Sequence, residues 1–187
     1  AKGTGCTIKG VCGKEAETSK WQDLLLSVVR GVGTIQHTLG GNASKEVADF
    51  LVDALFSTIT NANFDDQSIL NKVDTGIALK KQLFETALSK NITFPNYQEV
   101  HWGGEKSDYS AEGEREGVLR NENADLRSLK ELTVLGLKGI AAYYDHAARL
   151  GETNEEIIAF MCKALATITA PDADMETLLG IVLETGK

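Results

Sequence analysis

Residues 19–32 of the chain read SKWQDLLLSVVRGV and have the pattern of a buried helix. Ser19 followed three residues later by Gln22 is the pattern of a capping box, which starts a helix. The apolar side chains that follow recur at the spacing of one helix face, at Trp21, Leu24, Leu25, Val28, Val29 and Val32. We therefore predict a helix that starts at Ser19 and ends near Gly40.

The same periodicity continues outward along the chain. It predicts further helices over about 44–60, 65–90, 128–150 and 153–169, and a last one after Pro171. Ser128, with Glu131 three residues on, repeats the capping-box pattern. No run of alternating polar and apolar residues indicates a strand, so the predicted fold class is all-α.

The two halves of the chain resemble each other. Leu39-Gly40 aligns with Leu150-Gly151, and Asp65 aligns with Asp174. This pattern predicts two three-helix bundles related by an internal repeat and joined by a long irregular connector. The predicted parts are a cysteine- and glycine-rich segment (1–18), a first bundle (19–90), the connector (91–124) and a second bundle (125–187).

Composition excludes several classes of partner. The chain has 187 residues and a net charge of −8, which argues against a nucleic-acid-binding surface and against binding to anionic lipid. No apolar run reaches the length of about 18 residues that a membrane span needs. Three cysteines are an odd count, which disfavours a disulfide framework and favours a reducing cytoplasm.

The clearest chemical motif is residues 4–14, TGCTIKGVCGK. Cys6 and Cys12 are candidate metal ligands, since iron–sulfur clusters are usually held by four cysteine thiolates. The surrounding glycines would allow the backbone to approach a cluster, while Lys9 and Lys14 would offset its negative charge. Two ordinary thiols in a tail are the alternative, and zinc usually takes a shorter cysteine spacing.

The segment AKGTGCTIKGVCGK, residues 1–14, resembles the start of the hybrid cluster protein family, the hydroxylamine reductases. RSLKE at 127–131 and GLKGIAAY at 136–143 resemble the second bundle of that family's first domain. The resemblance implies that Cys6 and Cys12 are two of the four ligands of a 4Fe–4S cluster. It places the other two in a C-x2-C pair before Ala1, so we expect this chain to be a fragment.

The resemblance also implies a function for the parent protein. The 4Fe–4S cluster would relay electrons from an electron donor to a hybrid iron–sulfur–oxygen cluster in the remaining domains, where hydroxylamine or nitric oxide is reduced. No catalytic residue is carried over to this chain, and we expect the isolated fragment to be inactive. A metal-free helical interaction or scaffold module is the alternative, and the related carbon monoxide dehydrogenases are a third option.

Other reactive side chains have simpler interpretations. Cys162 lies on an apolar helix face and is predicted to be a small buried side chain. His37 and His146 fall near predicted helix C-termini, where positive charge is favourable. His101-Trp102 is interpreted as an aromatic anchor of the connector.

One glycine pattern and one glutamate pattern are also expected to have structural roles. Gly31-Val32-Gly33 lies inside a predicted helix, so it is expected to permit close helix packing instead of binding a nucleotide. Glu112, Glu114 and Glu116 are predicted to form a solvated, charged part of the connector.

Overall fold

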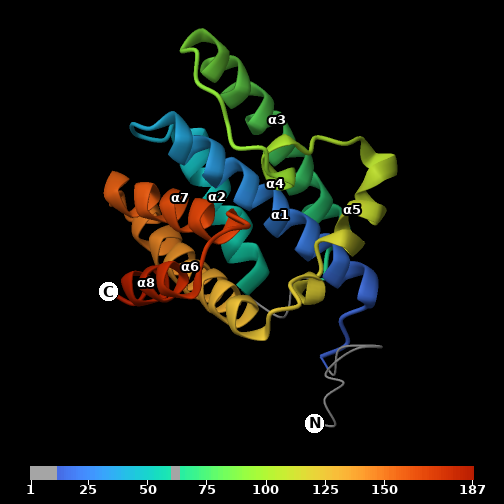
Figure 1. Ribbon diagram of the computed structural model, residues 1–187. Helices are drawn as coiled ribbons and strands as arrows, with labels where there is room; N and C mark the ends of the chain where they lie inside the picture. Colours follow the sequence, from blue (N-terminus) through green and yellow to red (C-terminus); the bar gives the residue numbers. More distant parts are fainter. Residues whose placement is uncertain (1–11, 60–63) are drawn as a thin grey trace.

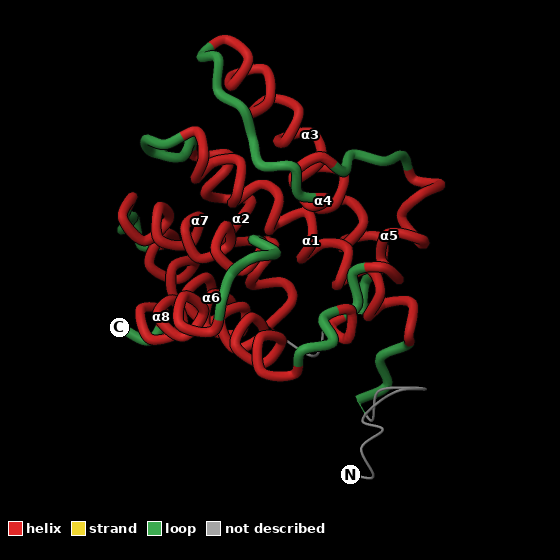
Figure 2. Tube along the Cα trace, viewed as in Figure 1, coloured by secondary structure: helices red, strands yellow, loops and turns green. Residues whose placement is uncertain are grey.

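The structure is a computed structural model that describes residues 12–59 and 64–187. All regular structure in that part of the chain is helical, which confirms the all-α prediction (Figures 1 and 2). None of its helices is both long and apolar enough to cross a membrane. The elements are α1 (Ala16–Leu39), α2 (Lys45–Ile59), α3 (Asp66–Ser89), α4 (Gln98–His101), η1 (Lys106–Asp108), α5 (Tyr109–Arg115), η2 (Val118–Arg120), α6 (Ala124–Arg149), α7 (Glu155–Thr169) and α8 (Met175–Thr185).

Helix α1 lies at the centre of the molecule (Figure 1). It packs against α2 and α3 of the first half, α4 and α5 of the connector, and α7 of the second half. Burial on several sides removes much apolar surface from water, which is the main favourable term in folding. Side chains along its length are at most 1% exposed, namely Leu24, Leu25, Val28, Val29, Val32 and Ile35.

Two glycines allow α1 to have close neighbours on two sides. A Cβ atom on Gly31 would lie 2.0 Å from the carbonyl oxygen of Glu99, and one on Gly33 would lie 2.7 Å from the Cβ of Leu165. Neither position has room for a side chain, so α4 and α7 both approach α1 because these residues are glycine. The predicted packing role of Gly31-Val32-Gly33 is confirmed.

The two halves share one apolar core. Helix α1 packs on α7, and α2 packs on α6, so the core runs through both halves. The order and length of the helices also agree: α1 has 24 residues and α6 has 26, while α2 and α7 have 15 each. The side chains of Asp65 and Asp174 both accept the backbone N–H of the residue three positions on. These matches support the predicted repeat, and the domain boundaries stay a prediction.

Two predicted helix starts are wrong. Helix α1 begins earlier than Ser19 and has Glu15 as its N-cap residue, so the end of the predicted cysteine- and glycine-rich segment (1–18) is helical. Helix α6 is capped by Asn123, whose side chain accepts two backbone N–H groups. Ser128 instead lies inside α6 and its hydroxyl donates to the carbonyl oxygen of Ala124. The capping-box pattern therefore occurred inside a helix, where a serine hydroxyl can bond to the preceding turn.

The connector is more ordered than predicted, because its short helices pack on α1 and are hydrogen-bonded to α3. Lys80 of α3 is only 2% exposed, and its ammonium donates to the carbonyl oxygens of Glu99, at 2.8 Å, and Trp102. Burial lowers the pKa of Lys80 to about 8. The Trp102 ring packs on Tyr109, whose hydroxyl donates to Asp74 at 2.6 Å. Lys80 and Asp74, both on α3, thus hold the two ends of this part of the connector.

The glycines of α1 give the first testable prediction. We expect Gly31→Ala to lower the free energy of unfolding by about 2 kcal/mol or more, since the new methyl group would collide with backbone. Gly180→Ala is the matched control, since Gly180 is also inside a helix but has no atom within 4 Å of the added carbon. That variant should gain roughly 0.5–1 kcal/mol from helix propensity. Urea unfolding checks both, and stabilisation by Gly31→Ala would contradict the packing argument.

Candidate functional site

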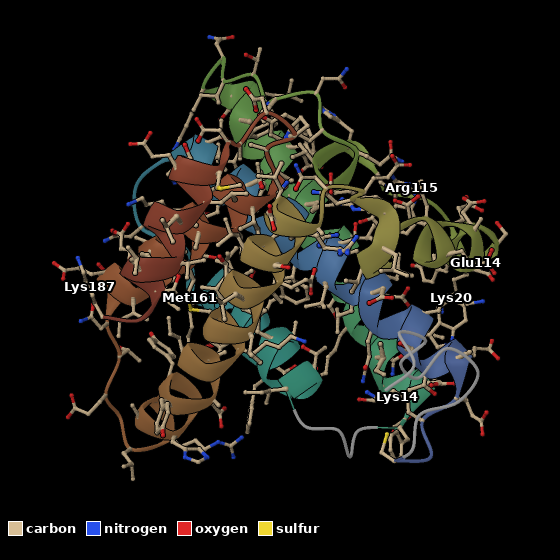
Figure 3. All side chains as sticks on the ribbon, turned by 60° about the horizontal axis from the view of Figure 1, so that its bottom comes forward. Lys14, Lys20, Glu114, Arg115, Met161 and Lys187 are labelled. Atoms are coloured by element: carbon tan, nitrogen blue, oxygen red, sulfur yellow. The ribbon has the colours of Figure 1, made fainter. Side chains whose placement is uncertain are left out.

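The cysteine segment joins the fold at the start of α1. Cys12 is exposed, and Gly13 has φ +95°, a backbone conformation that favours glycine. The ammonium of Lys14 donates to the side-chain oxygen of Gln22 on α1 at 2.8 Å (Figure 3). Cys6 lies outside the described residues, as does Lys9. The structure therefore places Cys12 next to the first turns of α1, and the predicted pairing of Cys6 with Cys12 stays a prediction.

Helix α5 of the connector covers the first turns of α1 beside this segment. The ammonium of Lys20 donates to the Ser110 hydroxyl at 2.8 Å and lies 3.7 Å from the carboxylate of Glu114 (Figure 3). It also lies 4.9 Å from the centre of the Trp21 ring, within the range of a cation–π contact. A Cβ on Gly113 would be 2.9 Å from the carbonyl oxygen of Lys20, so α5 sits directly against the backbone of α1.

A charged group lies between α1 and α6 close to the same end. Burial and the nearby charge of Glu131 raise the pKa of Asp23 to about 6, against the opposing charges of Arg30 and Lys138. Burial lowers the pKa of Lys138, although Glu131 and Asp23 act in the other direction. The Lys138 ammonium donates to the carbonyl oxygen of Thr58 at 3.3 Å. Asp23 is thus ionised at neutral pH in surroundings that disfavour its charge.

A second group of charges is buried deeper, around Glu116. The Glu116 side chain has no exposed surface and accepts from three arginines. Arg30 of α1 lies 2.5 Å from one carboxylate oxygen, Arg120 lies 2.6 Å away, and Arg115 completes the set. Hydrogen bonds to charged groups are among the strongest in proteins, so this carboxylate ties α1 to two parts of the connector.

Two further glutamates extend this buried ion cluster. Glu99 of α4 accepts from Arg120 at 2.5 Å and lies 3.9 Å from Arg30. Burial alone would raise the pKa of Glu99, but the hydrogen bond from Arg120 and the charge of Arg30 outweigh it, so the pKa is lowered. Glu112 accepts from Arg115 through both oxygens, at 2.7 and 3.1 Å. The cluster therefore joins α1, α4, α5 and η2.

The prediction of a solvated acidic segment is wrong for Glu112 and Glu116, which are 6% and 3% exposed. It agrees with the structure only for Glu114, whose side chain is 73% exposed. The physical reason is that both carboxylates are paired with arginines: Arg115 bonds to Glu112, and Arg30 of α1 reaches Glu116 from 86 residues away. The helical spacings of Glu112 with Arg115 and of Glu116 with Arg120 were the local signals of ion pairs.

The chemistry of the buried cluster indicates a structural role. Its carboxylates are paired with arginines, which stay protonated and offer no free ligand for a metal. Within residues 12–59 and 64–187, no group of three or more histidine, cysteine, aspartate or glutamate side chains is arranged to hold a metal ion. Its role in the described part of the chain is to fasten the connector onto α1.

The other cysteine and the histidines that the sequence singled out have structural roles. Cys162 is 2% exposed, and burial raises the pKa of its thiol to about 12, so its predicted role as a buried side chain is confirmed. His37 and His146 occupy the last turns of α1 and α6, as predicted. A ring nitrogen of His101 lies 3.1 Å from the carbonyl oxygen of Pro95, so His101 also holds the connector.

The ion cluster predicts a sharp contrast between neighbouring glutamates. Glu116→Gln should lower the free energy of unfolding by roughly 3 kcal/mol, because three arginines lose their common carboxylate. Glu114→Gln should change it by less than about 0.5 kcal/mol, since Glu114 is exposed. Chemical denaturation measures both. Equal effects of the two substitutions would refute the proposed role of the cluster.

Asp23 gives a prediction that depends on pH. Its folded-state pKa is about 6 and its ordinary value is 3.8, so the native state holds a proton that the unfolded state loses between these values. Stability contributed by this group therefore falls as the pH rises from about 4 to 6. Asp23→Asn should stabilise the chain at pH 7–8, by at most about 3 kcal/mol, with no gain below pH 4. A gain independent of pH in thermal unfolding would contradict this account.

The comparisons with known proteins cover the whole chain. Residues 2–187 match the model of the Prismane/CO dehydrogenase family. The chain is 47% identical over 190 residues to a hydroxylamine reductase of Bacteroides thetaiotaomicron. It is 43% identical to one of Porphyromonas gingivalis and 38% identical to one of Nitratidesulfovibrio vulgaris.

These alignments take in 97–100% of this chain but only 34–35% of each of those relatives. The chain thus spans about a third of their length. The resemblance found in the cysteine segment and the helices extends over both halves of the fold. The chain belongs to the Prismane/CO dehydrogenase family.

Proposed function

We propose that this chain is the N-terminal helical domain of a hydroxylamine reductase-like hybrid cluster protein. Cys6 and Cys12 then supply two of the four thiolates of a 4Fe–4S cluster. The observation that carries the proposal is the 47% identity over the full chain to a protein named hydroxylamine reductase. The activity belongs to the longer parent, and the isolated chain has none.

The described residues fit the proposed cluster in their donor chemistry. Cys12 is exposed on a segment that Lys14 ties to α1, so its thiol is accessible while the backbone next to it is held. Cys162 is buried on α7 with a raised pKa, so it is unsuited to be a ligand. This chain can thus offer Cys6 and Cys12, and the family resemblance assigns the other two ligands to a C-x2-C pair before Ala1.

The surroundings of Cys12 suit a group that carries electrons. A 4Fe–4S cluster, when bound, supplies a one-electron relay whose potential depends on nearby charge and solvent. Lys14 brings positive charge two residues from Cys12, and α5 covers the neighbouring turns of α1. The buried ion cluster fixes α5 on α1, and so it also fixes the surroundings of Cys12 that α5 provides.

The rest of the proposed reaction lies in other parts of the parent. An electron donor would reduce the relay cluster, and a hybrid iron–sulfur–oxygen cluster in the remaining domains would reduce hydroxylamine or nitric oxide. A cytoplasmic location accords with thiol ligands that must stay reduced. The relatives' extra length, about two thirds of each protein, is the room for those domains.

Anaerobic reconstitution with iron and sulfide tests the cluster. A chain restored with the parent's upstream C-x2-C pair should bind about four irons and show a cubane spectrum. The present chain should not hold a stable cluster alone, because it lacks half of the ligands. Four irons bound per molecule of the present chain would overturn this assignment.

Matched cysteine substitutions serve as controls in the restored chain. Cys12→Ser should abolish stable cluster binding, whereas Cys162→Ser should leave the iron content unchanged because Cys162 is buried away from solvent. If the restored chain binds no iron under any condition, a metal-free helical scaffold module becomes the better-supported function for this chain. Loss of iron from both variants alike would also count against the proposed ligands.

A further inference from the structure

A small polar cavity lies beside the buried ion cluster, between α1, η2 and the first turns of α6. Its volume is about 50 Å³. Its charged lining has more cations than carboxylates and consists of Arg30, Arg120, Arg127, Lys130, Glu116 and Glu131. The chain as a whole has a net charge of −8, so this local excess of positive charge runs against the overall balance. A cavity with an excess of positive charge attracts anions.

Two of these cations have no carboxylate partner among the described residues. Arg127 donates through Nη1 to the carbonyl oxygen of Asn121 at 2.8 Å, and the Lys130 ammonium donates to the carbonyl oxygen of Ala170 at 3.2 Å. A guanidinium has five N–H donors and an ammonium has three. Within the described part of the chain, most donors of these two half-buried side chains are therefore left without a protein acceptor.

The other groups at the cavity also show that negative charge is short. The Nε atom of Arg30 is buried and has no hydrogen-bond partner in residues 12–59 and 64–187. Burial and the positive charges of Arg120 and Arg30 lower the pKa of Lys130, although nearby carboxylates act in the other direction. The cations here are thus close enough to repel one another, and an added anion would relieve this repulsion.

The size and charge of the cavity define the class of ligand. A cavity needs roughly 10–15 Å³ to hold one water molecule, so 50 Å³ leaves room for about three to four non-hydrogen atoms. Four cations and two carboxylates line it, and Glu99, which accepts from Arg120 at 2.5 Å, adds a third negative charge. One positive charge is then left over, which matches a monovalent anion. Guanidinium groups bind planar oxyanions through pairs of parallel hydrogen bonds.

We propose that this cavity binds one small monovalent oxyanion, of the size and charge of nitrate, nitrite or bicarbonate. Arg127 and Lys130 supply the hydrogen bonds to the ion, and Arg120 adds positive charge from η2. A bound ion would link the start of α6 to the connector, because these cations come from both elements. The proposal rests on described residues alone and does not depend on the proposed iron–sulfur cluster.

Titration of the chain with sodium nitrate, followed by NMR, tests the proposal. Sodium gluconate, whose anion is too large for the cavity, keeps the ionic strength constant. The backbone amide signals of Gly117 and Arg127, which line the cavity, should move along a saturating curve for one site. Sulfate should bind about tenfold or more weakly, because its second charge would be buried without a partner.

Substitutions of single cations separate this site from general effects of salt. Arg127→Gln and Lys130→Gln should each weaken nitrate binding by about tenfold or more, since a charge-assisted hydrogen bond to the ion is lost. Arg149→Gln is the matched control, because Arg149 also lies on α6 but is 73% exposed and bonded to Asp145. It should change the affinity by less than about twofold. Circular dichroism of each variant checks that the helices are retained.

A crystal structure of the longer parent protein grown in sodium nitrate gives a second readout. It should show a flat four-atom ion in contact with Arg127 and Lys130. Water alone in the cavity, or a carboxylate side chain of the parent in it, contradicts the proposal. Equal affinities of Arg127→Gln and Arg149→Gln, or signals that shift in proportion to salt without saturating, contradict it as well. None of these readouts requires bound iron, so they are independent of the test of the cluster.

Discussion

Helices α4 and α7 both come close to the backbone of α1. The helix is buried on several sides, and Gly31 and Gly33 leave no room for side chains where α4 and α7 meet it. Because α7 belongs to the second half and α4 to the connector, these two contacts bring all parts of the described chain onto one helix. The shared core follows from this arrangement, since neither half covers α1 alone.

The buried ion cluster solves a problem that this arrangement creates. A connector laid over a buried helix has polar groups that lose water, and buried charges are tolerated only when they are paired and hydrogen-bonded. Glu116 meets three arginines, and Lys80 satisfies the carbonyl oxygens at the end of α4. Polar contacts thus set the position of the connector, while apolar packing holds the helices together. Cys12 lies at the edge of this assembly, close to the point where Lys14 reaches Gln22.

Most of the helices could be predicted from sequence because their apolar faces repeat with helical period, as in α1 and α7. Helix starts were less accurate, since the pattern around Ser128 is the same inside a helix and at its cap. The burial of Glu116 could not be predicted, because its partner Arg30 lies 86 residues away in the chain. For the candidate site, residue type and family resemblance singled out Cys12, but only the fold shows that its segment is tied to α1.

The contrast between the two described cysteines has a practical consequence. Thiol reagents attack the thiolate, and Cys162 is 2% exposed with a pKa raised to about 12, so it is protected on both counts. Its side chain lies within the core that joins the two halves. Labelling of Cys162 therefore requires that core to open, and its rate reports the frequency of opening under native conditions. The labelling rate of Cys162 thus measures how often the core opens, whereas the accessible thiol of Cys12 reacts without any opening.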